Sequence, residues 1–348
     1  MNLKEFINAY HKLSYSDRVV FYSTVTNNVD INADNLQDFL TKNRITEECK
    51  CVYCSGKHIV KNGTRKDGVQ TYICRDCGKS FSASSNSITS RTRKKISIWA
   101  KYLKCMIDKK TLNESADECG ISLRTAFVWR HKILDAIKEV AEKTYLEGVV
   151  EADETFFNVS YKGNHSKSNT FTMPRKAHKR GGSVHTKGLS NEKVCVPCAI
   201  DENGISYAKP AKLGKVSSYS ILYTFDNVIA PSSTLCTDHE KAYLDFAKKK
   251  QINLIQMEVE CNTLDVNNRM FGIQRINAYH SRLQGFIKKF HGVATKYLDN
   301  YIVWNDIVQN NHINTLELLK QLLGVITCIR KTIYNRDIPR RAALPEMA

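Results

Sequence analysis

Two things are scarce in this sequence: long apolar runs, and acidic residues in its later part. The chain has no apolar run of about 18 residues, the length that a transmembrane helix needs, which excludes a membrane-spanning protein. Its first residues, MNLKEFINAYHKL, lack the apolar core of a secretory signal peptide, so we expect a protein of the cytosol. From Val266 to Leu298 there is no Asp or Glu, although this run has the pattern of a helix with one polar side.

Charge is the next informative feature. The 348 residues are enough for two or three domains. The chain has 52 Lys and Arg against 35 Asp and Glu, a net charge of +17. Arg91 to Lys110 and Thr155 to Lys193 each hold eight basic residues and one acid. Such clusters favour a polyanionic partner, because phosphates are neutralised by local positive charge; the alternative is a solvated basic surface.

Cysteine spacing predicts a metal site. Twelve cysteines in a cytosolic chain do not imply a disulfide framework. Two pairs, each with a two-residue gap and separated by nineteen residues, have the spacing of a four-thiolate zinc ribbon over residues 49–82: Cys51, Cys54, Cys74 and Cys77. Bound Zn²⁺ would supply the folding energy that so short a segment lacks. Cys49 is an alternative ligand, whereas Cys195 and Cys198 lie in an alternating strand pattern and are interpreted as strand residues.

Residues 90–145 have the pattern of a helix-turn-helix domain. It follows a helical segment at residues 1–48, the ribbon and a Ser-rich stretch, SASSNSITSR, which is interpreted as a linker. We expect a first helix from Asn113 to Cys119, a turn at Gly120 and a second helix capped by Ser122. Three residues are then expected to face the major groove of DNA or its phosphates: Arg124, Thr125 and Arg130. An ordinary helical hairpin is the alternative.

Two aspartates follow apolar strands in the β-rich part of the chain that begins near Glu147. Asp153 follows Gly148-Val149-Val150, and Asp238 ends the strand pattern STLCT. Each carboxylate is therefore expected at the C-terminal edge of a strand, where open sheets gather ligands. Two such acids can bridge two divalent cations about 3.5–4 Å apart, an arrangement that serves in-line phosphoryl displacement. Taken singly, a strand-end Asp is more often a turn or cap residue.

Four segments together resemble a known family: VEADETFF, RGGSVHTKGLSNEKVCVPCAIDENG, LCTDHEKAY and INAYHSRLQGFIKKFHGVATKYLDNYIVW. From about Cys51 to Trp304 the chain is similar to the DDE-type transposases of bacterial insertion sequences, in the subgroup with an N-terminal zinc ribbon. The resemblance implies a multidomain α+β chain whose residues 147–310 form a ribonuclease-H-like domain, a mixed sheet flanked by helices.

The resemblance also implies an activity. Such enzymes use Mg²⁺ or Mn²⁺ to cut double-stranded DNA at the terminal inverted repeats of a mobile element, and then attack target DNA with the freed 3′-hydroxyl. It implies a bacterial, cytoplasmic, nucleoid-associated enzyme, and at least a homodimer to pair two element ends. The alternatives are a non-catalytic DNA-binding regulator derived from a transposase, and a nuclease without strand transfer.

A helix without carboxylates stands where the superfamily often has its third acid. In this subgroup the position is often Asn, usually with a Lys two turns later, and the match places Asn277 there. His280 is one turn further on the same face; Mg²⁺ prefers oxygen, which favours Asn277. Gln284 stands where the family has Lys, so Lys288 is the candidate cation for the scissile phosphate.

Two further segments are assigned less specifically. A basic insert at residues 160–193 is interpreted as a phosphate-contacting arm, with a solvated loop as the alternative. Its candidate contacts are Arg175, Lys176, Lys179 and Arg180. The C-terminal segment, residues 311–348, reads as helical and is expected either to serve assembly or to cover the sheet.

Overall fold

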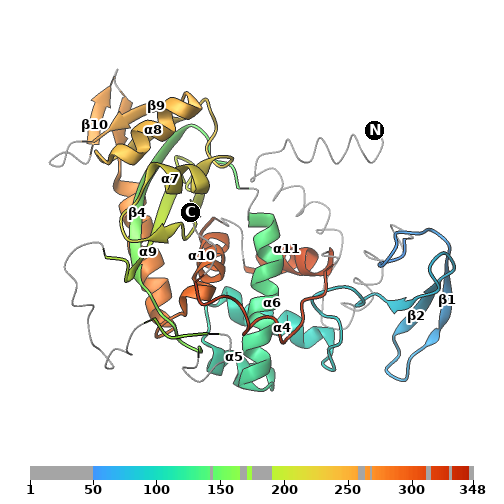
Figure 1. Ribbon diagram of the computed structural model, residues 1–348. Helices are drawn as coiled ribbons and strands as arrows, with labels where there is room; N and C mark the ends of the chain where they lie inside the picture. The colour runs from blue at the N-terminus through green and yellow to red at the C-terminus, as the bar shows by residue number, and fades with distance from the viewer. Residues whose placement is uncertain are drawn as a thin grey trace. The chain divides into compact units, whose positions relative to one another are not determined.

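The computed structural model divides the chain into two compact units, and each is described by itself (Figure 1). The first unit comprises residues 1–140 and 313–338, and the second comprises residues 141–312 and 339–348. The structure describes residues 50–141, 144–164, 171–174, 190–257, 263–266, 269–310, 315–328 and 331–344. The predicted helical segment at residues 1–48 lies outside them.

The first unit begins with a small antiparallel sheet in the order β1-β2-β3. Its strands are β1 (Ile59–Thr64), β2 (Gln70–Cys74) and β3 (Ser80–Ser82). Their core is small: Phe81 is buried and stacks on Tyr72 with ring centroids 5.9 Å apart, beside the buried Cys51 and Cys74. So little apolar burial gives a sheet of this size marginal stability on its own.

The Ser-rich stretch after the sheet is folded, and its interpretation as a linker is wrong. The Ser87 and Ser90 hydroxyls both donate to the carbonyl of Ser84, at 2.6 and 2.8 Å. Ile88 is fully buried among these turns. Serine side chains that bond to nearby backbone groups replace the hydrogen bonds of a helix or strand, so a composition typical of linkers forms an ordered turn here.

Four helices complete the first unit. They are α4 (Ile96–Ile107), α5 (Leu112–Cys119), α6 (Leu123–Ala141) and α11 (Thr315–Cys328). Thr111 and Glu114 form a capping box at the start of α5, and Gly120 ends that helix in a left-handed conformation at φ 58°. The Ser122 hydroxyl then accepts from the Thr125 N–H at 3.2 Å and starts α6. The three predicted landmarks, the first helix, the turn and the cap, are present.

α11 packs against α4 and belongs to the first unit, although the two helices lie far apart in the sequence (Figure 1). The expectation that the C-terminal helices cover the sheet of the catalytic domain is therefore wrong for this helix. The apolar face of α11 gave no hint of its partner, because any apolar surface would bury it equally well.

The second unit is built on a mixed sheet in the order β6-β5-β4-β8-β9, with the short β7 (Lys212–Leu213) also paired to β5. The strands are β4 (Val149–Asn158), β5 (Lys193–Asp201), β6 (Ser206–Ala208), β8 (Thr234–Thr237) and β9 (Asn253–Gln256). β4 pairs antiparallel with β5 and parallel with β8, and β9 continues the parallel side. An antiparallel meander joined to two parallel strands, with the first strand in the middle, is the ribonuclease-H-like arrangement that was predicted.

Helices flank this sheet, as expected. They are α7 (Ser218–Phe225), α8 (Lys241–Lys250), α9 (Gln274–Lys289) and α10 (Thr295–Asn310), and a hairpin of β10 (Thr263–Val266) and β11 (Arg269–Gly272) precedes α9. α9 packs on β4 and β5, while α7 and α8 pack on each other. Burial along α9 recurs at Ile276, Tyr279, Leu283 and Phe286, which places its polar residues on the remaining face.

Candidate active site and zinc centre

The parallel pairing of β4 and β8 brings the two predicted aspartates to the same level of the sheet. The pairing joins Glu151 to Cys236, and continuing it by two residues puts Asp153 beside Asp238. Paired strands lie about 4.8 Å apart. The charge of Asp238 contributes to the raised pKa of Asp153, which is compatible with this register.

Asp153 does not end its strand, which corrects one prediction. It is inside β4 and pairs with Cys198 of β5, whereas Asp238 directly follows β8, which ends at Thr237. The long antiparallel pairing with β5 carries β4 beyond the end of β8. Asp153 is therefore inside β4, next to the point where the adjacent strand β8 ends. On this register it is still at the same level of the sheet as Asp238.

Alternate residues of β4 meet α9 on one face of the sheet. Glu151, Asp153 and Thr155 all point to this helix. Three contacts follow in order along the helix: the Ile276 N–H donates to Glu151 Oε2 at 3.0 Å, His280 Nδ1 lies 3.7 Å from Asp153 Oδ2, and Gln284 Nε2 donates to Thr155 Oγ1 at 2.8 Å. The buried Glu151 also pairs with Arg275 at 3.1 Å, so a carboxylate anchors the positive N-terminal end of α9.

The structure brings His280 rather than Asn277 toward Asp153. Asn277 is in the first turn of α9 and is exposed, whereas the His280 side chain is only 13% exposed. Within the part of the chain that the structure describes, the buried His280 Nε2 has no hydrogen-bond partner. Burial lowers the pKa of His280 to about 4, so the ring is neutral at neutral pH and keeps a lone pair for a ligand. Both side chains remain candidates for the third position.

Burial makes this region unfavourable for negative charge. It raises the pKa of Asp153 to about 6, with a smaller contribution from Asp238, although the Glu154 N–H donates to Asp153 Oδ1 at 2.8 Å. Buried, closely spaced carboxylates without a counter-ion are typical of sites that bind a cation.

Sequence reasoning missed Glu154. Burial, followed by the charges of Asp153 and Asp238, raises its pKa to about 8, and the fully buried Tyr243 donates to its Oε2 at 3.2 Å. Because neighbouring strand residues face opposite sides, Glu154 lies on the α8 side while Asp153 faces α9. Its position beside Asp153 in ADETF was the available signal, but the tyrosine partner came from a distant helix.

Gln284 and Lys288 occupy different surroundings. Gln284 is bound to Thr155, and Lys288 is one turn further along α9 on an exposed face. Both line a cavity of about 380 Å³ between the end of β4 and α9, together with Phe157 and Gly292. The prediction that Lys288 supplies the cation for the scissile phosphate thus has an open cavity beside it and stays a prediction.

The four predicted zinc ligands lie together. Their Sγ atoms are all within 4.8 Å of one another, with Cys51–Cys77 at 3.7 Å and Cys54–Cys74 at 3.6 Å. Zn–S bonds of about 2.3 Å in a tetrahedron place sulfurs about 3.8 Å apart, so the cluster fits Zn²⁺. Cys49 lies outside the described residues.

The thiols of this cluster influence one another. Burial opposes ionisation of Cys51, but the backbone N–H groups of Cys54 and Tyr53 lower its pKa to about 7. The Gly56 N–H favours the Cys54 thiolate, yet its neighbours, Cys77 first, raise the Cys54 pKa to about 12. Crowded thiols that resist ionising together are stabilised by a cation. In the described part of the chain this is the one such cluster, and Cys195 and Cys198 are buried residues of β5, as interpreted.

The predicted DNA contacts of the first unit have different surroundings. Arg124 is exposed on α6, and the half-buried Thr125 bonds to the Ser122 hydroxyl at 2.9 Å. Arg130 is fully buried and donates to the Lys110 carbonyl at 2.8 Å, so its assignment to DNA is wrong. The position of Arg130 along the helix was compatible with the DNA-facing side or with the core. Its hydrogen bond to Lys110 links α6 to the chain just before α5.

The predicted contacts of the basic insert, Arg175, Lys176, Lys179 and Arg180, lie outside the described residues. No helix in the described ranges is long and apolar enough to cross a membrane.

Comparisons with known proteins show a similarity for most of the second unit. The sequence has no significant match among curated proteins. A solved structure described as a pre-cleavage Mos1 transpososome is similar over 68% of this chain and 79% of that chain, at 10% identity. Its TM-score of 0.19 is too low to carry an argument. Residues 145–303 match the family model of the ISXO2-like transposase domain, which spans both aspartates and α9. Over these residues the second unit is therefore similar to the ISXO2-like transposase domain.

Proposed function

We propose that this protein is a divalent-metal-dependent DNA transposase that cuts the ends of an insertion sequence and joins them to target DNA. One observation supports the proposal: β4 and β8 pair in parallel up to Glu151 and Cys236, and Asp153 and Asp238 each follow two residues later, in a region similar to a transposase domain. Carboxylate oxygens are the ligands that Mg²⁺ and Mn²⁺ prefer.

The residues around the aspartates suit this role. Asp153 and Asp238 would hold the metal, and α9 would present the third ligand, Asn277 or His280. Bound Mg²⁺ or Mn²⁺ would activate the attacking oxygen and stabilise the leaving oxygen of phosphoryl transfer. Glu151 holds the first turn of α9 against β4 through the Ile276 N–H, which fixes the distance between the helix and Asp153.

A neutral third ligand has a consequence for substrate binding. Asn277 and a neutral His280 add no negative charge to the two aspartates, so the metal is attracted less strongly than in a three-carboxylate site. We infer that oxygens of the DNA phosphate complete the metal shell, which couples metal binding to DNA binding.

Charge in the rest of the chain supports DNA as the partner. The net charge is +17, and Arg124 and Lys288 are exposed cations on helices of the first and second unit. Terminal inverted repeats and target DNA are the proposed substrates. Two element ends must be paired before joining, so we propose that the protein works as a homodimer or larger assembly on DNA.

The test is cleavage of DNA that carries the ends of the element, with Mn²⁺ as the added metal. We expect the wild type to cut, and Asp153→Asn and Asp238→Asn to abolish cutting while binding is retained. Asp226→Asn is the matched control, because Asp226 is an acid of the same unit that pairs with Lys250 at the surface. Cleavage that survives both active-site substitutions would overturn the proposal.

One observation favours the second candidate, a non-catalytic DNA-binding regulator. Gln284 occupies the position where the family resemblance implies Lys, and it is bound to Thr155. A regulator would bind the element ends and would not cut them with any divalent metal. A nuclease without strand transfer would cut them but leave a target plasmid unjoined, so adding the plasmid to the cleavage reaction separates all three.

A further inference from the structure

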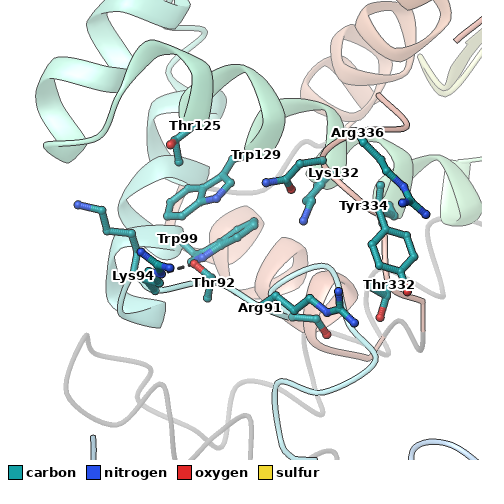
Figure 2. Close-up of a pocket in the computed structure, with 14 residues that line it drawn as sticks. Arg91, Thr92, Lys94, Trp99, Thr125, Trp129, Lys132, Thr332, Tyr334 and Arg336 are labelled. Atoms are coloured by element: carbon teal, nitrogen blue, oxygen red, sulfur yellow. Dashed lines mark hydrogen bonds between the residues drawn. The ribbon is translucent and has the colours of Figure 1, made fainter. Parts of the chain in front are cut away.

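The first unit contains a cavity of about 780 Å³ away from the aspartates (Figure 2). Three segments distant in sequence enclose it. They are the loop at residues 90–94, the facing sides of α4 and α6, and the segment at residues 332–336 near the C-terminus. Figure 2 shows the stacked rings of Trp99 and Trp129 on one side, with Arg91 and Tyr334 across from them.

Positive charge dominates the wall of this cavity. Its charged lining residues are Arg91, Arg93, Lys94, Lys132 and Arg336, and no acid is among the described residues that line it. Three of these cations have other contacts: Lys94 Nζ donates to the Gly120 carbonyl at 3.3 Å, Arg336 pairs with Asp337 at 3.5 Å, and the Arg91 guanidinium lies over the Tyr334 ring, 5.3 Å from its centroid. Cations gathered around one space repel each other, so an anion that enters it is stabilised.

Lys132 is the most informative of these residues. It is only 6% exposed, and burial lowers the pKa of its amine. Lys132 lines the cavity together with four other cations, and no acid in the described part of the chain lines it. A largely buried ammonium is costly unless it is paired, so an anion that enters the cavity would be stabilised by this amine.

The remaining wall suits an oxygen-rich anion with a flat group attached. Trp99 and Trp129 stack with centroids 3.9 Å apart, and the hydroxyls of Thr92, Thr125 and Thr332 also line the space. Small-ligand pockets have volumes of about 300–1,000 Å³. Lysine and arginine donate charge-assisted hydrogen bonds to phosphate oxygens.

We propose that this cavity is a phosphate-binding site, distinct from the aspartate site, and that the C-terminal segment at residues 332–336 forms one of its walls. Thr125, which was predicted to face the major groove of DNA or its phosphates, also lines this cavity. The phosphate belongs either to a DNA backbone or to a free phosphate compound. The DNA source rests on the proposed function, whereas binding of inorganic phosphate does not.

The first experiment titrates the zinc-loaded full-length protein with sodium phosphate at constant ionic strength. Tryptophan fluorescence reports on it, because Trp99 and Trp129 line the cavity and Trp304 is in the other unit. We expect saturable binding that Lys132→Met weakens about tenfold, the value of one charge-assisted hydrogen bond. Lys132→Met also removes a largely buried charge, so the first unit should be more stable, a gain that a purely structural lysine would not give.

Two further variants make the result specific. Arg91→Ala, at an exposed residue of the cavity wall, should weaken phosphate binding to a similar extent, and Lys101→Ala, an exposed cation of α4 outside the cavity, should not. Asp153→Asn should bind phosphate as the wild type does, which separates this site from the failure of the transposase proposal. Phosphate binding that is absent, or equal in Lys132→Met, Arg91→Ala and Lys101→Ala, overturns the site.

A second titration, with a short DNA duplex, identifies the source of the phosphate. If the DNA backbone enters the cavity, Lys132→Met weakens duplex binding relative to Lys101→Ala, and inorganic phosphate competes with the duplex. If a free phosphate compound is the ligand, the duplex binds both variants equally while phosphate affinity still differs. Each of these results supports the site and assigns its ligand.

Discussion

The four-cysteine cluster and the proposed aspartate site would both hold metal, yet they are built in opposite ways. The cluster draws its ligands from one short stretch, Cys51 to Cys77, and its sulfurs already stand at the separations of tetrahedral zinc. The proposed aspartate site draws on β4, the end of β8 and α9, and Asp153 approaches that helix at 3.7 Å, through His280.

The cysteine cluster can supply all the ligands of its metal, whereas the proposed aspartate site would leave ligand positions for the substrate. Four thiolates fill the zinc shell and make the metal part of the fold. Two aspartates and a neutral side chain would leave ligand positions open in the proposed site, and burial raises the pKa of Asp153 to about 6. A buried carboxylate of this kind costs stability, as is common for residues of functional sites.

Zinc removal should have the largest effect and should act on one site alone. For zinc-finger peptides the metal contributes about 10–16 kcal/mol of apparent folding free energy. A chelator should therefore unfold β1–β3 and leave the sheet of the second unit folded. Hydrogen exchange followed by mass spectrometry measures this directly, as lost protection in peptides of the ribbon and retained protection in β4 and β5.

Cysteine substitutions sharpen the same comparison. Cys74→Ala should lose zinc, whereas Cys198→Ala should keep it, although both residues belong to pairs with the same two-residue gap. Zinc content per chain is the measurement. Retained zinc in Cys74→Ala would mean that another thiol, such as Cys49, replaces it.

The third ligand of the aspartate site is the next test. His280→Ala should weaken Mn²⁺ binding by about 10- to 100-fold, because its ring faces Asp153. Asn277→Ala, one turn away on the same helix and exposed, is the matched variant and should have the smaller effect. Calorimetric titration with Mn²⁺ measures both. If Asn277→Ala costs more, α9 must move when metal and DNA bind, and the sequence match identified the ligand correctly.

The difference in folding stability between Asp153→Asn and the wild type should depend on pH, because ionisation of Asp153 destabilises the fold. The pKa of Asp153 is about 6 when folded, above its ordinary 3.8, so ionisation there destabilises the fold. The cost is absent below about pH 4 and complete above about pH 6. Asp153→Asn should thus be more stable than the wild type by about 1–2 kcal/mol at pH 7.5 without Mg²⁺ or Mn²⁺, and equal to it near pH 4.

Hydrogen exchange in β4 and β5, compared between variant and wild type at each pH, measures this difference. Asp226→Asn, at a surface ion pair, is the control and should show no such pH dependence. A variant less stable than the wild type at pH 7.5 would mean that Asp153 is already compensated by a partner.

The parts that the sequence predicted well are those set by local chemistry. Cysteine spacing defines a metal knuckle within a few residues, and the Gly120 turn and Ser122 cap are decided by backbone conformation and one hydrogen bond. Asp153 and Asp238 were predicted to meet because each comes after an apolar run, and the parallel pairing of β4 and β8 up to Glu151 and Cys236 is compatible with that prediction.

The parts that it missed depend on partners far away in the chain. Arg130 has helix spacing that fits either a DNA groove or a core, and only the carbonyl of Lys110 decides for the core. Glu154 lies next to Asp153 and accepts a hydrogen bond from Tyr243 of α8, a partner that the local sequence does not indicate. The ordered serine turn was missed because its composition is typical of a linker. Asp153 was predicted at the end of its strand because the apolar run stops before it. Pairing with β5 continues β4 to Asn158, so Asp153 is inside the strand.

The smallest expected effect is the change in cleavage rate on substitution of Gln284, the α9 residue bound to Thr155. Gln284→Lys loses the hydrogen bond to Thr155, worth about 1 kcal/mol of stability. It also places a cation near the phosphate to be cut, so cleavage of element ends should rise about threefold to fivefold, as for one partly screened charge. Gln284→Met loses the same bond without adding charge and should only slow cleavage.

The interpretation of the Gln284→Lys result depends on whether Lys288 already contacts the phosphate in the wild type. If Lys288 supplies the cation in the wild type, Lys288→Ala should slow cleavage strongly in that background and weakly when combined with Gln284→Lys. The cavity that both residues line leaves room for either side chain to approach a bound phosphate. Cleavage rates of the two single variants and the double variant measure this coupling; purely additive effects would show that the two positions do not share one phosphate.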